Sequence, residues 1–173
     1  MWSMSRVTAV STIVANVTVV VSLTIAVLSY TSQIAQTKRD AAIALASEFR
    51  SGDLLASQRR LAIELAKLGL GRFQGIAIER ETIGDIVSNL VSASATPDEI
   101  RQDIITIVSY FDDVAICVNV GTCDEPVIRT SLGETATRYA CLLLPYTQKI
   151  AREQLLEGLG DELRSFVDYK KAC

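Results

Sequence analysis

The sequence predicts an all-α protein in which one N-terminal transmembrane helix continues as a stalk into a small antiparallel helical bundle. Residues 7–37 contain no Asp, Glu, Lys or Arg. In the charged remainder, apolar residues recur at helical spacing, and no segment alternates with the two-residue period of a β-strand. Helix start and stop signals divide this remainder into segments of helical length. We therefore divide the chain into an anchor (residues 1–31), a stalk with the first cytoplasmic helices (32–68) and a helical bundle domain (69–173).

The uncharged stretch is long enough to cross a membrane. Its most apolar part, residues 7–30, would form a helix about 36 Å long, against a hydrocarbon core of roughly 30 Å. A cleaved signal peptide is the competing interpretation, but its apolar region would be shorter and would end at a small-x-small site. Residues 28–31 match such a site poorly. We therefore expect a permanent anchor.

The Lys and Arg residues beside the anchor predict its orientation, because cytoplasmic flanks are enriched in positive charge. The N-terminal flank holds Arg6 and the amino group, whereas the other flank holds more cations, namely Lys38, Arg39, Arg50, Arg59 and Arg60. We therefore predict a location in the cell (inner) membrane, with the N-terminus outside and the C-terminal domain in the cytoplasm. The same five cations are candidates for contacts with anionic lipid headgroups, and an ordinary solvated helix face explains them equally well.

One face of the anchor, with its borders, is rich in small and hydroxylated residues. Along this face they recur at alternating spacings of three and four, the period of a left-handed helix pair. The candidates for helix–helix packing in the membrane are Thr8, Ser11, Ala15, Asn16, Thr18, Ser22, Ala26 and Ser29. Such residues favour close backbone approach and interhelical hydrogen bonds. Alternatively, the hydroxyls bond only to carbonyls of their own helix.

The remainder of the chain predicts a stalk and six further helices. The stalk runs to residue 50, and the helices cover residues 54–68, 79–91, 97–120, 124–132, 134–157 and 161–171. We expect the helix after Thr96 to be the central one, with Thr96 and Glu99 forming a capping box around Pro97. Its expected buried stripe is Ile100, Ile104, Ile107, Val108, Phe111, Val114, Ala115 and Val118. Gly133 should bend the chain between two helices, and Pro145 should kink the second of them.

The four cysteines of the chain are Cys117, Cys123, Cys141 and Cys173. They include no CxxC pair, the chain has no histidine, and their spacing does not fit a zinc site. Because we place them in the cytoplasm, where disulfides are rare, we expect buried or terminal thiols.

The sequence excludes several kinds of chemistry. Without histidine, neither a Ser-His or Cys-His nucleophile pair nor an HExxH metal site can form. The adjacent Asp112 and Asp113 point about 100° apart on a helix, so we expect a solvated face or an arginine partner rather than an acid/base pair. Residues 97–173 hold 8 basic and 13 acidic residues, which argues against nucleic acid binding. We therefore expect no enzyme, cofactor or metal.

The order of these features resembles an uncharacterised bacterial family of membrane-anchored helical proteins, classed as a domain of unknown function. The matching residues are Phe49-Arg50-Ser51, Arg59-Arg60-Leu61, Tyr110-Phe111, Gly121, Leu132-Gly133, Tyr139, Pro145 and Arg152. The chain lacks a tryptophan that members often carry in the penultimate helix. The resemblance implies a fold and a topology over most of the chain, and no catalytic residues.

Two functional hypotheses follow from these observations. The first is a single-pass structural or interaction protein, whose partners are the membrane and either copies of itself or the subunits of a membrane complex. It depends on the small-residue face, the stalk and the missing chemistry. The second is a membrane-tethered sensor or regulatory module that binds a small ligand in its helical bundle.

Overall fold

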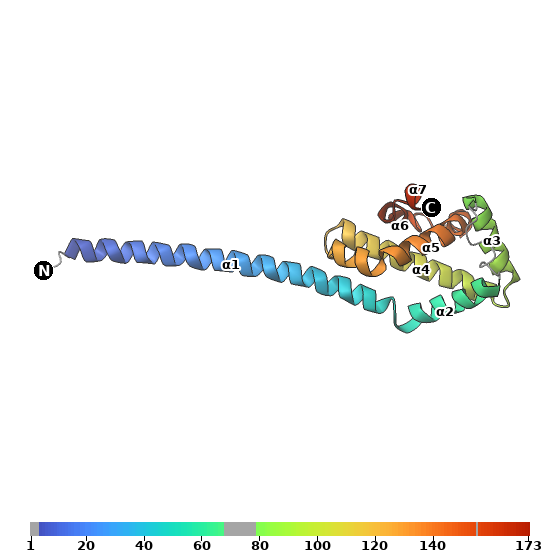
Figure 1. Ribbon diagram of the computed structural model, residues 1–173, viewed down its shortest axis with the longest axis horizontal. Helices are drawn as coiled ribbons and strands as arrows, with labels where there is room; N and C mark the ends of the chain where they lie inside the picture. The colour runs from blue at the N-terminus through green and yellow to red at the C-terminus, as the bar shows by residue number, and fades with distance from the viewer. Residues whose placement is uncertain (1–3, 68–78, 155) are drawn as a thin grey trace. The chain divides into compact units, whose positions relative to one another are not determined.

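The computed structural model describes the backbone of residues 4–67, 79–154 and 156–173, and the side chains of these residues except 4–16, 152–154 and 172. All regular elements in these ranges are helices, which confirms the all-α class (Figure 1). In chain order they are α1 (Met4–Glu48), α2 (Gly52–Lys67), α3 (Arg80–Ala93), α4 (Pro97–Asn119), α5 (Glu125–Gln154), α6 (Asp161–Phe166) and α7 (Tyr169–Ala172).

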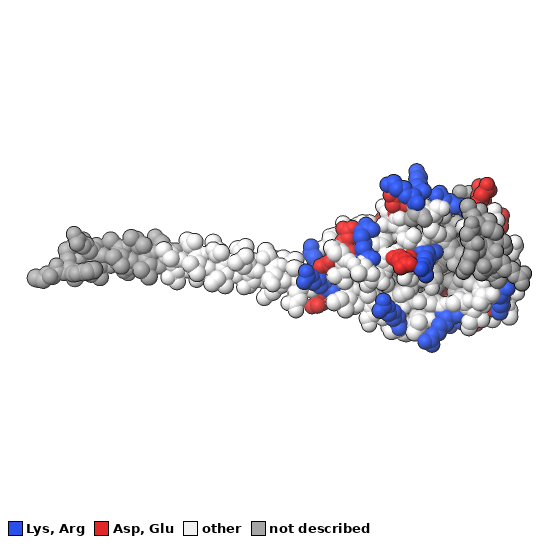
Figure 2. Space-filling view, viewed as in Figure 1, with Lys and Arg blue, Asp and Glu red and all other residues white. Residues whose placement is uncertain are grey.

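The chain forms two compact units, Met1–Lys38 and Arg39–Cys173. Helix α1 contributes to both, because its last turns pack in the second unit, where Ala42 is fully buried. Figure 2 shows charged side chains spread over the second unit, whereas the described part of α1 before Lys38 carries none. The long apolar helix therefore leads into a charged helical bundle, as the sequence predicted.

Helix α4 lies at the centre of the bundle. It contacts α2, α3, α5 and α6, and it forms an antiparallel pair with α5 across the turn at residues 120–124 (Figure 1). Most of the predicted apolar stripe of α4 is buried, namely Ile100, Ile104, Ile107, Val108, Phe111, Val114 and Ala115, whereas Val118 is half-buried. The Phe111 ring lies 5.1–5.8 Å, centroid to centroid, from the rings of Phe49, Tyr110 and Tyr139. These aromatic contacts join α4, α5 and Phe49, the residue that directly follows α1, in one core.

The end of α1 is fixed to α4 by a hydrogen bond as well as by packing. The Tyr110 hydroxyl donates to the Leu45 carbonyl at 2.6 Å. Burial raises the pKa of Tyr110, and the nearby Glu48 charge adds to this effect. Tyr110 therefore keeps the proton that it donates, and this hydrogen bond links the last turn of α1 to α4.

The start of α4 differs from the predicted capping box. Pro97 occupies the first turn as expected, but the Thr96 side chain makes no capping hydrogen bond. Instead, the Thr96 amide donates to the Ser94 hydroxyl at 3.2 Å. The turn at residues 94–96 satisfies this amide locally, so the Glu99 side chain is not needed for it.

Helix α5 replaces the two helices that were predicted around Gly133. It runs unbroken from Glu125 to Gln154, through both Gly133 and Pro145. A glycine inside a helix costs only about 1 kcal/mol relative to alanine, and the packing of α5 against α3 and α4 outweighs that cost. The predicted bend at Gly133 is therefore wrong.

The C-terminal segment also differs from the prediction of one helix over residues 161–171. It forms α6 and α7, separated by Asp168 in the left-handed conformation (φ 48°). Aspartate tolerates this conformation better than most residues. The change of direction lets Tyr169 become buried and brings the C-terminus to α5.

Substitution of Gly84 by leucine is expected to lower the free energy of unfolding by about 1–3 kcal/mol through overpacking. A Cβ atom at Gly84 would lie 3.2 Å from the backbone of Pro145, so even this one atom requires a small shift between α3 and α5, and a leucine side chain requires a larger one. As the matched control, Gly133→Ala adds a Cβ whose closest neighbour lies 3.9 Å away, and should stabilise the helix by up to about 1 kcal/mol. Urea unfolding of both variants, followed by near-ultraviolet circular dichroism, measures the difference. Equal changes in the free energy of unfolding of the two variants would contradict the close approach of α3 and α5 at Gly84.

Candidate functional site

The first candidate feature is the apolar part of α1. The described span Val17–Glu48 contains an apolar window of 18 residues with a mean hydropathy of 1.7, and this window is not buried inside the protein. By length and composition this helix could cross a membrane, although a signal sequence near an N-terminus has the same properties. Of the residues predicted to pack in the membrane, Thr18, Ser22, Ala26 and Ser29 are exposed on α1. Thr8, Ser11, Ala15 and Asn16 lie in the same helix, but their side chains are outside the described ones.

The five predicted headgroup cations lie in different environments. Arg50 and Arg59 are exposed and Lys38 is half-buried. The Arg39 Nε lies 3.3 Å from an Asp124 carboxylate oxygen. Their contact with lipid stays a prediction.

The fifth cation, Arg60, is bound to a buried carboxylate. Its Nε and one terminal nitrogen donate to the two oxygens of Asp103 at 2.8 and 2.6 Å. Asp103 is only 3% exposed, so this fork of hydrogen bonds supplies the partner that a buried charge requires. The pair joins α2 to α4, and sequence spacing gave no sign of it because the two residues lie 43 positions apart.

All four cysteines form disulfides, which corrects the expectation of free thiols. Cys117 is bonded to Cys123 across the turn between α4 and α5, and Cys141 of α5 is bonded to Cys173 (Cα–Cα 5.3 and 5.4 Å). The expectation was wrong because it followed from the assigned compartment, and because the second pair is brought together only by the fold.

Asp112 holds the start of α6 against α4. Its two carboxylate oxygens accept hydrogen bonds from the backbone amides of Gly160 (2.6 Å) and Leu163 (2.8 Å). The expected solvated face or arginine partner is therefore wrong for Asp112, because a helix N-terminus supplies the donors instead. Gly160 adopts φ 87° at this junction, and a Cβ there would lie 2.3 Å from a Leu144 methyl group.

The titration of Asp112 should make stability fall as the pH rises above the ordinary carboxyl range. Burial raises its pKa above the ordinary 3.8, and the hydrogen bonds from Leu163 and Gly160 offset only part of this effect. Between the pKa of Asp112 in the unfolded chain and its higher pKa in the folded protein, the folded protein keeps a proton that the unfolded chain has lost. The free energy of unfolding is therefore largest below this pH range and decreases as the pH rises through it. The difference in unfolding free energy between wild type and Asp112→Asn should therefore fall as the pH rises from the ordinary carboxyl pKa of 3.8 through the raised pKa of Asp112. A constant difference in urea titrations would contradict this assignment.

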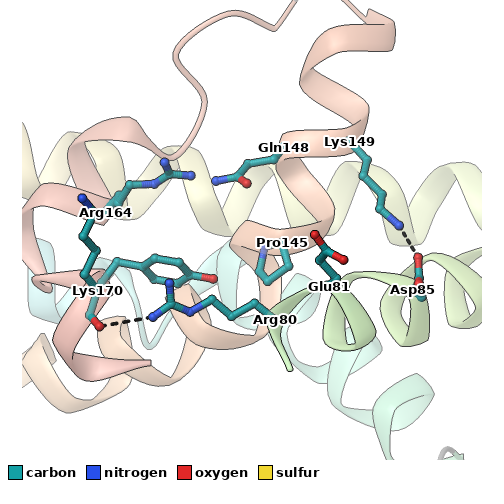
Figure 3. Close-up of a pocket in the computed structure, with 9 residues that line it drawn as sticks. Arg80, Glu81, Asp85, Pro145, Gln148, Lys149, Arg164 and Lys170 are labelled. Atoms are coloured by element: carbon teal, nitrogen blue, oxygen red, sulfur yellow. Dashed lines mark hydrogen bonds and ion pairs between the residues drawn. The ribbon is translucent and has the colours of Figure 1, made fainter. Parts of the chain in front are cut away.

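A charged cleft opens between α3, α5 and the C-terminal helices (Figure 3). Its volume is about 490 Å³, within the range of small-molecule sites. The lining residues are Arg80, Glu81 and Asp85 of α3, Pro145, Gln148 and Lys149 of α5, Arg164 of α6, and Tyr169 and Lys170 of α7. Lys149 and Asp85 form an ion pair across the α3–α5 wall.

The C-terminal wall of the cleft is held by several independent contacts. The Arg80 guanidinium lies over the Tyr169 ring, 4.9 Å from its centroid, and donates to the Lys170 carbonyl at 3.2 Å. Arg164 approaches the same ring at 5.7 Å. The Cys141–Cys173 disulfide ties the end of this segment to α5. These contacts link the C-terminal segment to α3 and α5.

The comparison with protein families identifies the group to which this fold belongs. A family model described as a domain of unknown function, DUF4760, matches residues 16–156. The chain belongs to the DUF4760 family. This match confirms the resemblance to an uncharacterised domain family. Comparisons with curated proteins and with solved structures found no match.

The residues matched by the DUF4760 model form only part of the cleft. The match includes the α3 and α5 walls but ends before α6, so Arg164, Tyr169 and Lys170 lie beyond it. The sequence did not predict the cleft because its cations come from four separate helices. The only local signal was a basic residue near the start of α3 and a Lys-Lys pair close to the C-terminus.

Proposed function

We propose that the chain is a single-pass membrane-anchored structural or interaction protein, whose helix α1 tethers a disulfide-bonded helical domain to a membrane. The observation that carries this proposal is the exposed apolar surface of α1. Its large side chains are 50–66% exposed, namely Val17, Val19, Val20, Val21, Leu23, Ile25, Val27, Leu28 and Tyr30. Exposed apolar surface costs roughly 25 cal/mol per Å² in water, and lipid removes that cost. A non-catalytic role is supported by the absence of histidine from the sequence.

The two disulfides indicate on which side of the membrane the domain lies. Flanking cations favour the cytoplasm, but this bias is modest because Arg6 and the amino group oppose it. Disulfides persist in oxidising compartments and are rare in the cytosol. We therefore propose that the domain lies on the oxidising side, opposite to the orientation that the charges alone favour. Alkaline phosphatase fused after Cys173 should be active in a bacterial host, since it requires export; an inactive, stably expressed fusion would reverse this orientation.

The partners in this proposal are copies of the same anchor or other subunits of a membrane complex, bound through the small-residue face of α1. Replacement of Ser11, Ala15 and Ser22 by leucine is expected to abolish self-association, because bulky side chains prevent close backbone approach. A membrane two-hybrid assay measures the association. The matched control places leucine on the opposite face, at positions 13, 20 and 27, and should leave the signal unchanged. An unchanged signal in the first variant would contradict the role of this face.

A membrane-tethered sensor or regulatory module is the second candidate function. The specific observation that favours it is the cleft between α3, α5 and the C-terminal segment, which has the volume of a small-molecule site and is lined by charged groups. In this alternative the ligand lies in a cleft open to solvent and not within the packed core around Phe111.

A further inference from the structure

The cleft carries an excess of positive charge. Four of its lining residues are cations and two are acids. Lys149 is neutralised by Asp85. Among the described residues, no carboxylate forms an ion pair with any of the other three cations, Arg80, Arg164 and Lys170. They face one remaining acid, Glu81, so the cleft suits an anion.

Arg164 has the least satisfied side chain of the three. Its Nε is buried and has no hydrogen-bond partner among the described residues. A buried donor without an acceptor is unfavourable, and native proteins usually satisfy such groups. Figure 3 shows the Arg164 guanidinium directed across the cleft toward the Gln148 side chain. The buried Nε itself is closed to solvent, so an anionic ligand in the cleft would accept from the terminal nitrogens of this guanidinium.

We propose that the cleft binds the phosphate group of a small molecule or a lipid headgroup, held by Arg80, Arg164 and Lys170. A phosphate carries up to two negative charges and at least three acceptor oxygens, so one group can bond to two guanidiniums and one ammonium. A carboxylate has only two oxygens and one charge, and leaves part of this donor set unsatisfied. The cleft is larger than one phosphate, which leaves room for the body of the ligand.

Two further residues suit the body of such a ligand. Burial raises the pKa of Tyr169, and the nearby Arg80 and Arg164 only partly oppose this effect, so its hydroxyl keeps its proton. The Glu81 carboxylate faces the same cleft near Pro145 (Figure 3) and accepts hydrogen bonds from hydroxyl or amino groups. Arg164 and Lys170 lie outside the residues matched by the family model. The site goes beyond the tethering role and does not depend on it.

The test uses the full-length protein in an uncharged maltoside detergent. Isothermal titration with inorganic phosphate is compared with chloride at matched ionic strength. Arg164→Gln and Lys170→Gln should each weaken phosphate binding at least about tenfold, since a hydrogen bond to a charged group contributes that much or more. Arg138→Gln, which removes an exposed α5 arginine outside the cleft, should bind as wild type does. Because Arg164 also contacts Tyr169, the exposed Lys170 variant keeps the test valid if the Arg164 variant unfolds.

A second arm distinguishes the two sources of the phosphate group. The melting temperature of the domain is measured in lipid nanodiscs of phosphatidylcholine alone and with added phosphatidic acid. Stabilisation by phosphatidic acid that Lys170→Gln removes would identify a lipid headgroup, and binding of inorganic phosphate alone would identify a soluble ligand. The proposal would be overturned if the protein neither bound inorganic phosphate nor was stabilised by phosphatidic acid, or if wild type and Lys170→Gln responded equally. That failure would leave the anchor and association tests unaffected.

Discussion

Replacement of Phe111 by alanine should lower the free energy of unfolding of the domain by about 3–5 kcal/mol. The Phe111 side chain is fully buried, and its ring contacts those of Phe49, Tyr110 and Tyr139. Its loss would leave a cavity where α1, α4 and α5 meet, and the surrounding helices would relax only in part. Urea unfolding of the full chain in detergent, followed by the near-ultraviolet signal of its tyrosines, measures this loss.

The matched control for Phe111→Ala is Ile63→Ala on α2. Ile63 is 61% exposed, so its truncation should change the unfolding free energy by no more than about 0.5 kcal/mol. If the two variants unfolded at the same urea concentration, Phe111 would not be the centre of the core.

Removal of the Cys141–Cys173 disulfide should lower the unfolding free energy by roughly 3–4 kcal/mol in the chain-entropy account. The bond closes a loop with a sequence separation of 32 and holds α7 against α5. The variant Cys141→Ala with Cys173→Ala avoids a free thiol that could exchange. Urea unfolding under non-reducing conditions compares it with wild type.

The second disulfide supplies the internal comparison for this experiment. Cys117 and Cys123 are separated by 6 positions, so replacing both by alanine should lower stability by only roughly 2 kcal/mol. Reduction of the wild-type protein should lower its free energy of unfolding by the contributions of both disulfides. A wild-type unfolding curve that does not respond to reductant would mean that the cysteines are thiols in the native protein.

The elements that the sequence predicted best are those with strong local signals. The uncharged stretch indicated α1, and Thr96-Pro97 with a long apolar stripe located α4 and its buried face. Gly133 misled the analysis, because a local breaker signal competes with packing along the whole of α5 and the packing is stronger. The split between α6 and α7 depends on Asp168, whose left-handed conformation has only a weak local signal.

The candidate site was much less predictable than the helices. The pairs Arg60–Asp103 and Asp112–Gly160 meet through contacts between residues far apart in the chain, and the cations that line the cleft are likewise spread along the sequence. A single sequence carries no local pattern for such pairs. The cysteine prediction failed for another reason, since an orientation inferred from a modest charge bias was used to exclude disulfides.

The most direct test of a membrane-tethered, disulfide-bonded domain is a thiol count on alkali-washed membranes. Cells are lysed in N-ethylmaleimide, the membranes are washed with carbonate, and the pellet is treated with maleimide-polyethylene glycol before and after reduction. The account predicts full-length protein in the pellet, with no gel shift before reduction and four modified cysteines after it. Intact protein in the supernatant, or cysteines already blocked by N-ethylmaleimide, would contradict it.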